Sequence, residues 1–170
     1  MALFPPDIES AAARIVAEFR VKSLMLVTAE SCTGGLIAGA LTEIAGSSTV
    51  VERGLVTYTN RAKVEILGVA QQTLDAFGAV SRETALEMAT GALACSPASV
   101  SIAVTGIAGP GGGSAPKPVG LVHLAASARG GKTMHREMRY GDIGRSDVRL
   151  ATLRTAFEML LEIAEGKPQA

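Results

Sequence analysis

Aromatic residues and charge of either sign are the first shortages in this 170-residue chain. It contains no tryptophan, only two tyrosines and four phenylalanines, and sixteen basic residues that balance sixteen acidic ones. Stacking platforms for bases are therefore scarce, and no excess positive charge attracts a phosphate backbone. We expect no nucleic-acid partner.

Cysteines and long apolar runs are also few. Cys32 and Cys95 are the only cysteines, and no set of His, Cys, Asp or Glu has a familiar metal-ligand spacing, so we expect no metal. No apolar run has the length of a membrane span, and the opening residues "MALFPPDIES" lack a cationic leader. We expect a cytoplasmic protein with reduced thiols and no membrane partner.

Apolar residues, by contrast, make up 48% of the chain, which is enough to build a core. Neither an internal repeat nor a linker interrupts the sequence, so we predict one domain over residues 1–170. High apolar content with few surface charges favours self-association, and we expect a homo-oligomer.

Alternating strand and helix patterns indicate the fold. Apolar, β-branched runs of strand length occur at 23–29, 48–59 and 98–106. Helical spacing occurs at 8–20, 33–45, 60–67, after Ser81, and at 146–165. Two further strands, 119–128 and 132–140, are joined by a Gly-rich hairpin. Since helices separate the first three strands, we predict a three-layer α/β/α fold with a mixed, mostly parallel sheet of about five strands.

The stretch "TAESCTGG" places a polar cluster where the first predicted strand ends and a helix begins. Ligands of α/β proteins collect at this edge of the sheet, and N–H groups at a helix start attract anions. Ser31 is therefore a candidate nucleophile, although a simple helix cap is the more common reason for a serine at such a position. Cys32 is a weaker candidate, because no histidine motif is present to activate it.

A second cluster, "YTNRAK", follows the second strand. Lys63 falls in the first turn of a helix, where a cation opposes the helix dipole. A lysine acts as a base near neutral pH only when burial or a cationic neighbour lowers its pKa, and Arg61 is such a neighbour. Asn60 is the expected cap of this helix. A solvated lysine remains the alternative.

The third cluster, "TGIAGPGGG", follows the third strand from Thr105. It lacks the Gly-Lys-Ser/Thr of a Walker A loop and the spacing of a dinucleotide fingerprint, but its backbone suits a phosphate or a carboxamide. A plain flexible loop is equally compatible. His123 and His135 have no obvious triad partner and are expected to be structural. Arg145 and Arg149 form either a phosphate clamp or a solvated helix face.

Taken together, these motifs resemble the C-terminal domain family of the competence/damage-inducible protein CinA. The resemblance rests on "TAESCTGG", "GLVTYTNRAK", "FGAVSRETALEMA", "TGIAGPGGGS" and "KPVGLV", and it covers residues 8 to 160 in a stand-alone form. It implies a nicotinamide-nucleotide amidase of pyridine nucleotide salvage, which converts the carboxamide of nicotinamide mononucleotide to nicotinate mononucleotide and ammonia. It implies no cofactor.

The resemblance also implies roles for particular residues. Ser31 would be the nucleophile, with Lys63 and Tyr58 as its proton-transfer partners. Backbone N–H groups from Thr33 to Gly35 would hold the oxyanion. The substrate nucleotide would be bound by Glu30, Thr33, Gly34, Gly35, Asn60, Thr105, Gly106, Gly109 and Arg145. The segment "GDIGRSDVR" carries one residue more than the family pattern, which leaves open whether Arg145 or Arg149 meets the phosphate.

Two other functions stay open at this stage. A non-catalytic module that binds a nucleotide or a partner, linked to competence or DNA damage, needs neither a nucleophile nor a base. A Ser/Lys hydrolase acting on another amide needs both. Ser31 and Lys63 therefore separate the first alternative from the amidase, whereas only the substrate separates the second.

Overall fold

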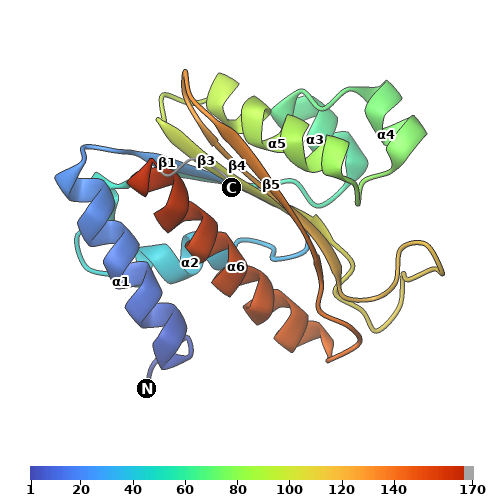
Figure 1. Ribbon diagram of the computed structural model, residues 1–170, viewed down its shortest axis with the longest axis horizontal. Helices are drawn as coiled ribbons and strands as arrows, with labels where there is room; N and C mark the ends of the chain where they lie inside the picture. Colours follow the sequence, from blue (N-terminus) through green and yellow to red (C-terminus); the bar gives the residue numbers. More distant parts are fainter. Residues whose placement is uncertain (167–170) are drawn as a thin grey trace.

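A five-stranded sheet forms the middle layer of the computed structural model, which describes residues 1–166 (Figure 1). The strands are β1 (Leu26–Glu30), β2 (Val51–Val56), β3 (Val100–Gly106), β4 (Leu121–Ala128) and β5 (Thr133–Arg139). Their order is β2-β1-β3-β4-β5. β1 pairs in parallel with β2 and β3, whereas the β3–β4 and β4–β5 pairs are antiparallel. β4 thus runs against the other four strands, which confirms a mixed sheet.

Helices cover both faces of the sheet. One face carries α1 (Pro6–Val21), α2 (Leu36–Thr42) and α6 (Arg145–Glu165), and the other carries α3 (Asn60–Leu67), α4 (Gln71–Phe77) and α5 (Arg82–Ala94) (Figure 1). This arrangement confirms the three-layer α/β/α prediction. Within residues 1–166, none of these helices combines the length and the apolar character that a membrane crossing requires. The last four residues of the predicted single domain lie outside the described residues.

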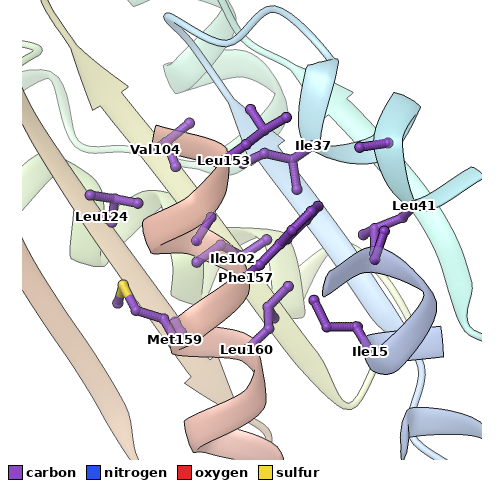
Figure 2. Close-up of a cluster of buried hydrophobic side chains, with 14 of the residues drawn as sticks. Ile15, Ile37, Leu41, Ile102, Val104, Leu124, Leu153, Phe157, Met159 and Leu160 are labelled. Carbon is purple, nitrogen blue, oxygen red and sulfur yellow. The ribbon is translucent and has the colours of Figure 1, made fainter. Parts of the chain in front are cut away.

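The two faces are packed with side chains of different size. Neighbouring residues of a strand point to opposite faces, so Ile102 and Val104 face α1, α2 and α6, whereas Ala103 faces α3 and α5. Figure 2 shows the first face, where Phe157 of α6 lies among large aliphatic side chains from α1, α2 and the sheet. Alanines dominate the second face and allow helices to approach the sheet closely.

Close packing on that second face places α3. A side-chain carbon at Gly91 of α5 would lie 1.8 Å from the carbonyl oxygen of Leu67, which is a collision. The two helices are therefore in backbone contact. This contact holds α3 at the end of β2, with Lys63 turned inward.

Some predicted boundaries are wrong. Helix α2 begins at Leu36 rather than at residue 33, because residues 31–35 form a tight turn in which Gly34 and Gly35 have positive φ. The predicted strand 48–59 splits into a 3₁₀ turn, Ser47–Thr49, and the shorter β2. Helix α4 was not predicted, because it is short and buries only Leu74, so its periodic signal is weak.

Candidate active site

Three strand ends meet at one edge of the sheet, as the three polar clusters predict. Ser31 follows β1, Tyr58 follows β2, and Thr105 lies near the end of β3. They border a pocket of about 270 Å³. Its lining residues are Ser31, Cys32, Tyr58, Lys63, Ala79, Val80, Thr105, Gly106, Ile107, Ala108, Gly109, Gly111, Gly112 and Arg145.

The turn after β1 is held by a buried carboxylate. Glu30 accepts hydrogen bonds from the hydroxyl of Thr33 at 2.6 Å and from the backbone N–H groups of Gly35, Ile37 and Ala38 at 3.1, 3.0 and 2.9 Å. A negative charge that caps a helix start in this way is stabilising. Glu30 therefore lies behind the pocket and fixes the turn that carries Ser31.

Lys63 meets Ser31 inside the protein. Its Nζ lies 2.9 Å from Ser31 Oγ, 2.8 Å from the Thr57 carbonyl oxygen and 3.4 Å from the Tyr58 carbonyl oxygen. Lys63 is 1% exposed and Ser31 is 8% exposed. The structure thus excludes the solvated lysine.

No carboxylate neutralises this lysine, since no ion pair of Lys63 occurs among the described residues. Burial lowers the pKa of Lys63 from 10.5 to about 8. Arg61 does not supply the shift, because its exposed side chain pairs with Glu65 at 2.6 Å. The predicted cationic neighbour is therefore wrong, and desolvation takes its place.

The start of α3 is capped by Thr59, not by Asn60 as predicted. The Thr59 hydroxyl accepts a hydrogen bond from the N–H group of Ala62 at 3.1 Å. Thr59 has extended backbone geometry, and Asn60 is already the first helical residue. Asn60 is exposed and does not line the pocket.

The two candidate arginines of α6 make different contacts. Arg145 lines the pocket, and its guanidinium donates to the Tyr58 hydroxyl at 2.9 Å and to the Gly109 carbonyl at 2.8 Å. Arg149 turns away from the pocket and donates to the carbonyls of Cys32 and Thr33, both at 3.1 Å. A ligand in the pocket therefore meets Arg145.

The third wall brings in residues that sequence reasoning missed. The Thr105 hydroxyl donates to the Ala79 carbonyl at 2.8 Å and so ties the segment between α4 and α5 to the end of β3. As a result, Ala79 and Val80 line the pocket beside Gly106. Small apolar residues carry no chemical signal of their own. Their place inside the "FGAVSRETALEMA" stretch was the only available hint.

The turn residues contribute less to the pocket than expected. Thr33, Gly34 and Gly35 lie outside its lining, as does Glu30. The Gly34 N–H already donates to the Ser31 carbonyl at 3.0 Å, and the Gly35 N–H donates to Glu30. Within residues 1–166, the N–H groups of Cys32 and Thr33 are the ones in this turn that donate to no other residue.

The remaining candidates stay in structural positions. Burial raises the pKa of the Cys32 thiol to about 12, which leaves it protonated and a poor nucleophile. His123 and His135 stack with ring centroids 5.2 Å apart and share a 2.9 Å hydrogen bond outside the pocket. Among the residues that the structure describes, no group of three His, Cys, Asp or Glu is placed to hold a metal.

The pocket thus combines a serine hydroxyl, a buried amine and an arginine. No aspartate or glutamate stands among the described residues that line it. Such a site suits an anionic ligand with an electrophilic carbon near Ser31, and the chemistry it can perform is attack by Ser31 with proton transfer to Lys63.

Comparisons with known proteins agree with this picture. The sequence model of the CinA C-terminal domain matches residues 8–164. The nicotinamide-nucleotide amidohydrolase PncC of Enterobacter agglomerans is 49% identical over 137 residues, which cover 80% of this chain and 82% of that protein. The crystal structure of the competence/damage inducible protein CihA from Agrobacterium tumefaciens has a TM-score of 0.95 and 68% identity, and covers 96% of this chain and 99% of its own.

Other relatives are much longer. The CinA-like protein of Akkermansia muciniphila is 47% identical over 154 residues, or 91% of this chain, but these make up 37% of that protein. The chain therefore spans little more than a third of the length of such relatives.

Proposed function

Because the chain belongs to the CinA C-terminal domain family, we propose that it hydrolyses the carboxamide of nicotinamide mononucleotide. The products are nicotinate mononucleotide and ammonia. A relative of similar length, 49% identical, carries the name of this activity. The observation that carries the proposal is the 2.9 Å contact between Lys63 Nζ and Ser31 Oγ inside the pocket.

The surroundings of Lys63 suit a neutral amine. Two of its neighbours, the carbonyl oxygens of Thr57 and Tyr58, only accept hydrogen bonds and so take the two N–H groups of an –NH₂. The nitrogen lone pair is then left for the hydroxyl proton of Ser31. With a pKa of about 8, roughly a tenth of Lys63 is neutral at pH 7. An ordinary lysine is neutral to about 0.03% at that pH.

The first half of the reaction forms an ester. Ser31 Oγ attacks the carboxamide carbon while its proton passes to Lys63 Nζ, and the amide oxygen becomes an oxyanion. When this intermediate collapses, the C–N bond breaks and the departing nitrogen takes up a proton to leave as ammonia. Lys63 returns the proton it received, so the acyl-enzyme forms with the amine neutral again.

Tyr58 would assist that departure. Its hydroxyl oxygen accepts a hydrogen bond from Arg145, so its O–H group can still donate a hydrogen bond to the leaving nitrogen while Lys63 supplies the proton. In the second half, water attacks the ester carbon, Lys63 takes the proton of that water, and Ser31 leaves with a proton as the alcohol. The product acid leaves the site as a carboxylate.

Arg145 is the residue that would meet the substrate phosphate. Its guanidinium lies at the pocket edge and bridges Tyr58 and the Gly-rich loop at Gly109. Arginine binds phosphate oxygens in a bidentate fashion, and Gly111 and Gly112 leave room for the nucleotide backbone to approach.

The test is ammonia release from a panel of amides, namely nicotinamide mononucleotide, nicotinamide and NAD. We expect turnover of the mononucleotide and little of nicotinamide, which lacks the phosphate that Arg145 binds. The control is Ser31→Ala, which should reduce the rate by at least about 10³-fold while the protein stays folded.

Binding of the mononucleotide without release of ammonia would instead indicate a non-catalytic module. Faster turnover of another amide would indicate a Ser/Lys hydrolase with a different substrate. Either result contradicts the proposal.

A further inference from the structure

We infer that Arg149 is a positioning residue, which holds the turn after Ser31 so that the N–H group of Cys32, at the pocket wall, faces the reacting amide oxygen. This inference rests on the proposed hydrolysis. It gives a role to the arginine that does not line the pocket.

The contacts of Arg149 are with the backbone. Its Nε donates to the Cys32 carbonyl and its Nη2 to the Thr33 carbonyl, each at 3.1 Å. These are the two residues that directly follow the candidate nucleophile. A planar guanidinium that binds two successive carbonyls fixes the orientation of both peptide units.

The orientation of a carbonyl determines that of the next N–H group. In a trans peptide unit the C=O and N–H bonds point in opposite directions, and the Cys32–Thr33 bond is trans. The Thr33–Gly34 bond is trans as well, so when Arg149 binds the Thr33 oxygen, the Gly34 N–H points away from Arg149 and donates to the Ser31 carbonyl. The Ser31 carbonyl is likewise held by the Gly34 N–H at 3.0 Å, which directs the Cys32 N–H away from Gly34.

The oxyanion has few other donors in this turn. The N–H groups of Gly34 and Gly35 already donate to Ser31 and Glu30, whereas those of Cys32 and Thr33 donate to no other residue within residues 1–166. Cys32 also lines the pocket beside Ser31. Preorganised N–H donors stabilise an oxyanion more than a ground-state carbonyl, so their misplacement lowers kcat rather than substrate affinity.

The experiment compares three variants of α6 by kcat and KM for ammonia release from nicotinamide mononucleotide. Arg149→Met removes both carbonyl contacts, and Arg149→Lys keeps the charge without the planar fork. Arg154→Met is the matched control, because it removes the same charge from the same helix where it forms a surface ion pair with Asp7 at 2.6 Å. Rates are expressed per folded molecule, with folding checked by circular dichroism.

We expect kcat of Arg149→Met to fall about 10²-fold with KM within about threefold of wild type. The kcat of Arg149→Lys should exceed that of Arg149→Met by less than about tenfold, and the kcat of Arg154→Met should match wild type. If Arg149→Met does not fold, the Lys variant decides, with kcat at least about tenfold below wild type expected.

An Arg149→Met protein with normal kcat per folded molecule, or with a loss confined to KM, would overturn the inference. The proposed function would still stand in that case, because the wild type turns over the substrate. Absence of ammonia release from the wild type would instead refute the proposed function itself, and the role of Arg149 with it.

Discussion

Two buried charges stand at neighbouring strand ends, Glu30 after β1 and Lys63 beside the end of β2. Glu30 is fully buried, and four donors surround its carboxylate. Lys63 is equally buried, but its neighbours are one hydroxyl and two carbonyls, with no opposite charge among the described residues. The carboxylate is saturated and faces away from the pocket, whereas the amine faces into it.

This difference separates a structural from a chemical role. A carboxylate whose two oxygens accept four hydrogen bonds from its own turn has little left to offer a ligand. A buried amine without a counter-ion is destabilised in its charged form, and burial lowers the pKa of Lys63 towards neutrality. Substitutions at the two positions should therefore affect different properties.

The largest effect is expected at Lys63. Lys63→Arg keeps the charge, but a guanidinium does not accept a proton in this pH range, so kcat should fall by about 10³-fold or more, nearly as far as in Lys63→Ala. Steady-state kinetics over a range of substrate concentrations measure this. Substantial turnover in Lys63→Arg would remove Lys63 as the base and make Tyr58 the next candidate.

A substitution of Glu30 should lower the stability of the fold rather than kcat. Glu30→Gln removes the charge at the start of α2 and turns an amide NH₂ towards groups that are themselves donors, at a cost of about 2–3 kcal/mol of unfolding free energy. Urea unfolding measures this, and kcat per folded molecule should stay within about tenfold of wild type. A Glu30→Gln protein that is inactive but normally stable would contradict the structural role of Glu30.

A smaller gain in stability should follow the loss of the lysine charge. In the folded protein the Lys63 pKa lies below its unfolded value of about 10.5, so the unfolded state binds the proton more tightly and the charged amine opposes folding below pH 8. Lys63→Met should raise the unfolding free energy at pH 7 by about 1 kcal/mol, after the two unpaired carbonyls offset part of the relief.

The gain should shrink as the pH rises from 8 towards 10.5, where the wild-type lysine is neutral in both states. Thermal unfolding of both proteins at pH 7 and pH 10 tests this sign. Equal destabilisation of Lys63→Met at both pH values would show that Lys63 contributes as an ordinary hydrogen-bonding residue.

The sequence was sufficient to bring Ser31, Tyr58, Lys63 and Thr105 to one sheet edge, because each lies near or after the end of a strand and parallel strands end together. It was not sufficient to bury Lys63, since that depends on the backbone contact between α3 and α5 at Gly91.

The sequence also did not show that the two arginines make different contacts. Arg145 and Arg149 stand one turn apart on α6, and only the packing of that helix against the turn after β1 directs Arg149 to the carbonyls of Cys32 and Thr33. The family resemblance implied that Glu30 is among the substrate ligands. Strand alternation instead turns it to the opposite face of the sheet, under α2.

The pH dependence of turnover tests the central claim, that a buried and unpaired Lys63 activates Ser31, most directly. If the neutral amine is the active form, kcat/KM should rise about tenfold per pH unit below pH 8 and level off above it, following the pKa of about 8 of the free protein. A kcat/KM that is constant between pH 6 and pH 8 in the wild type would contradict the account.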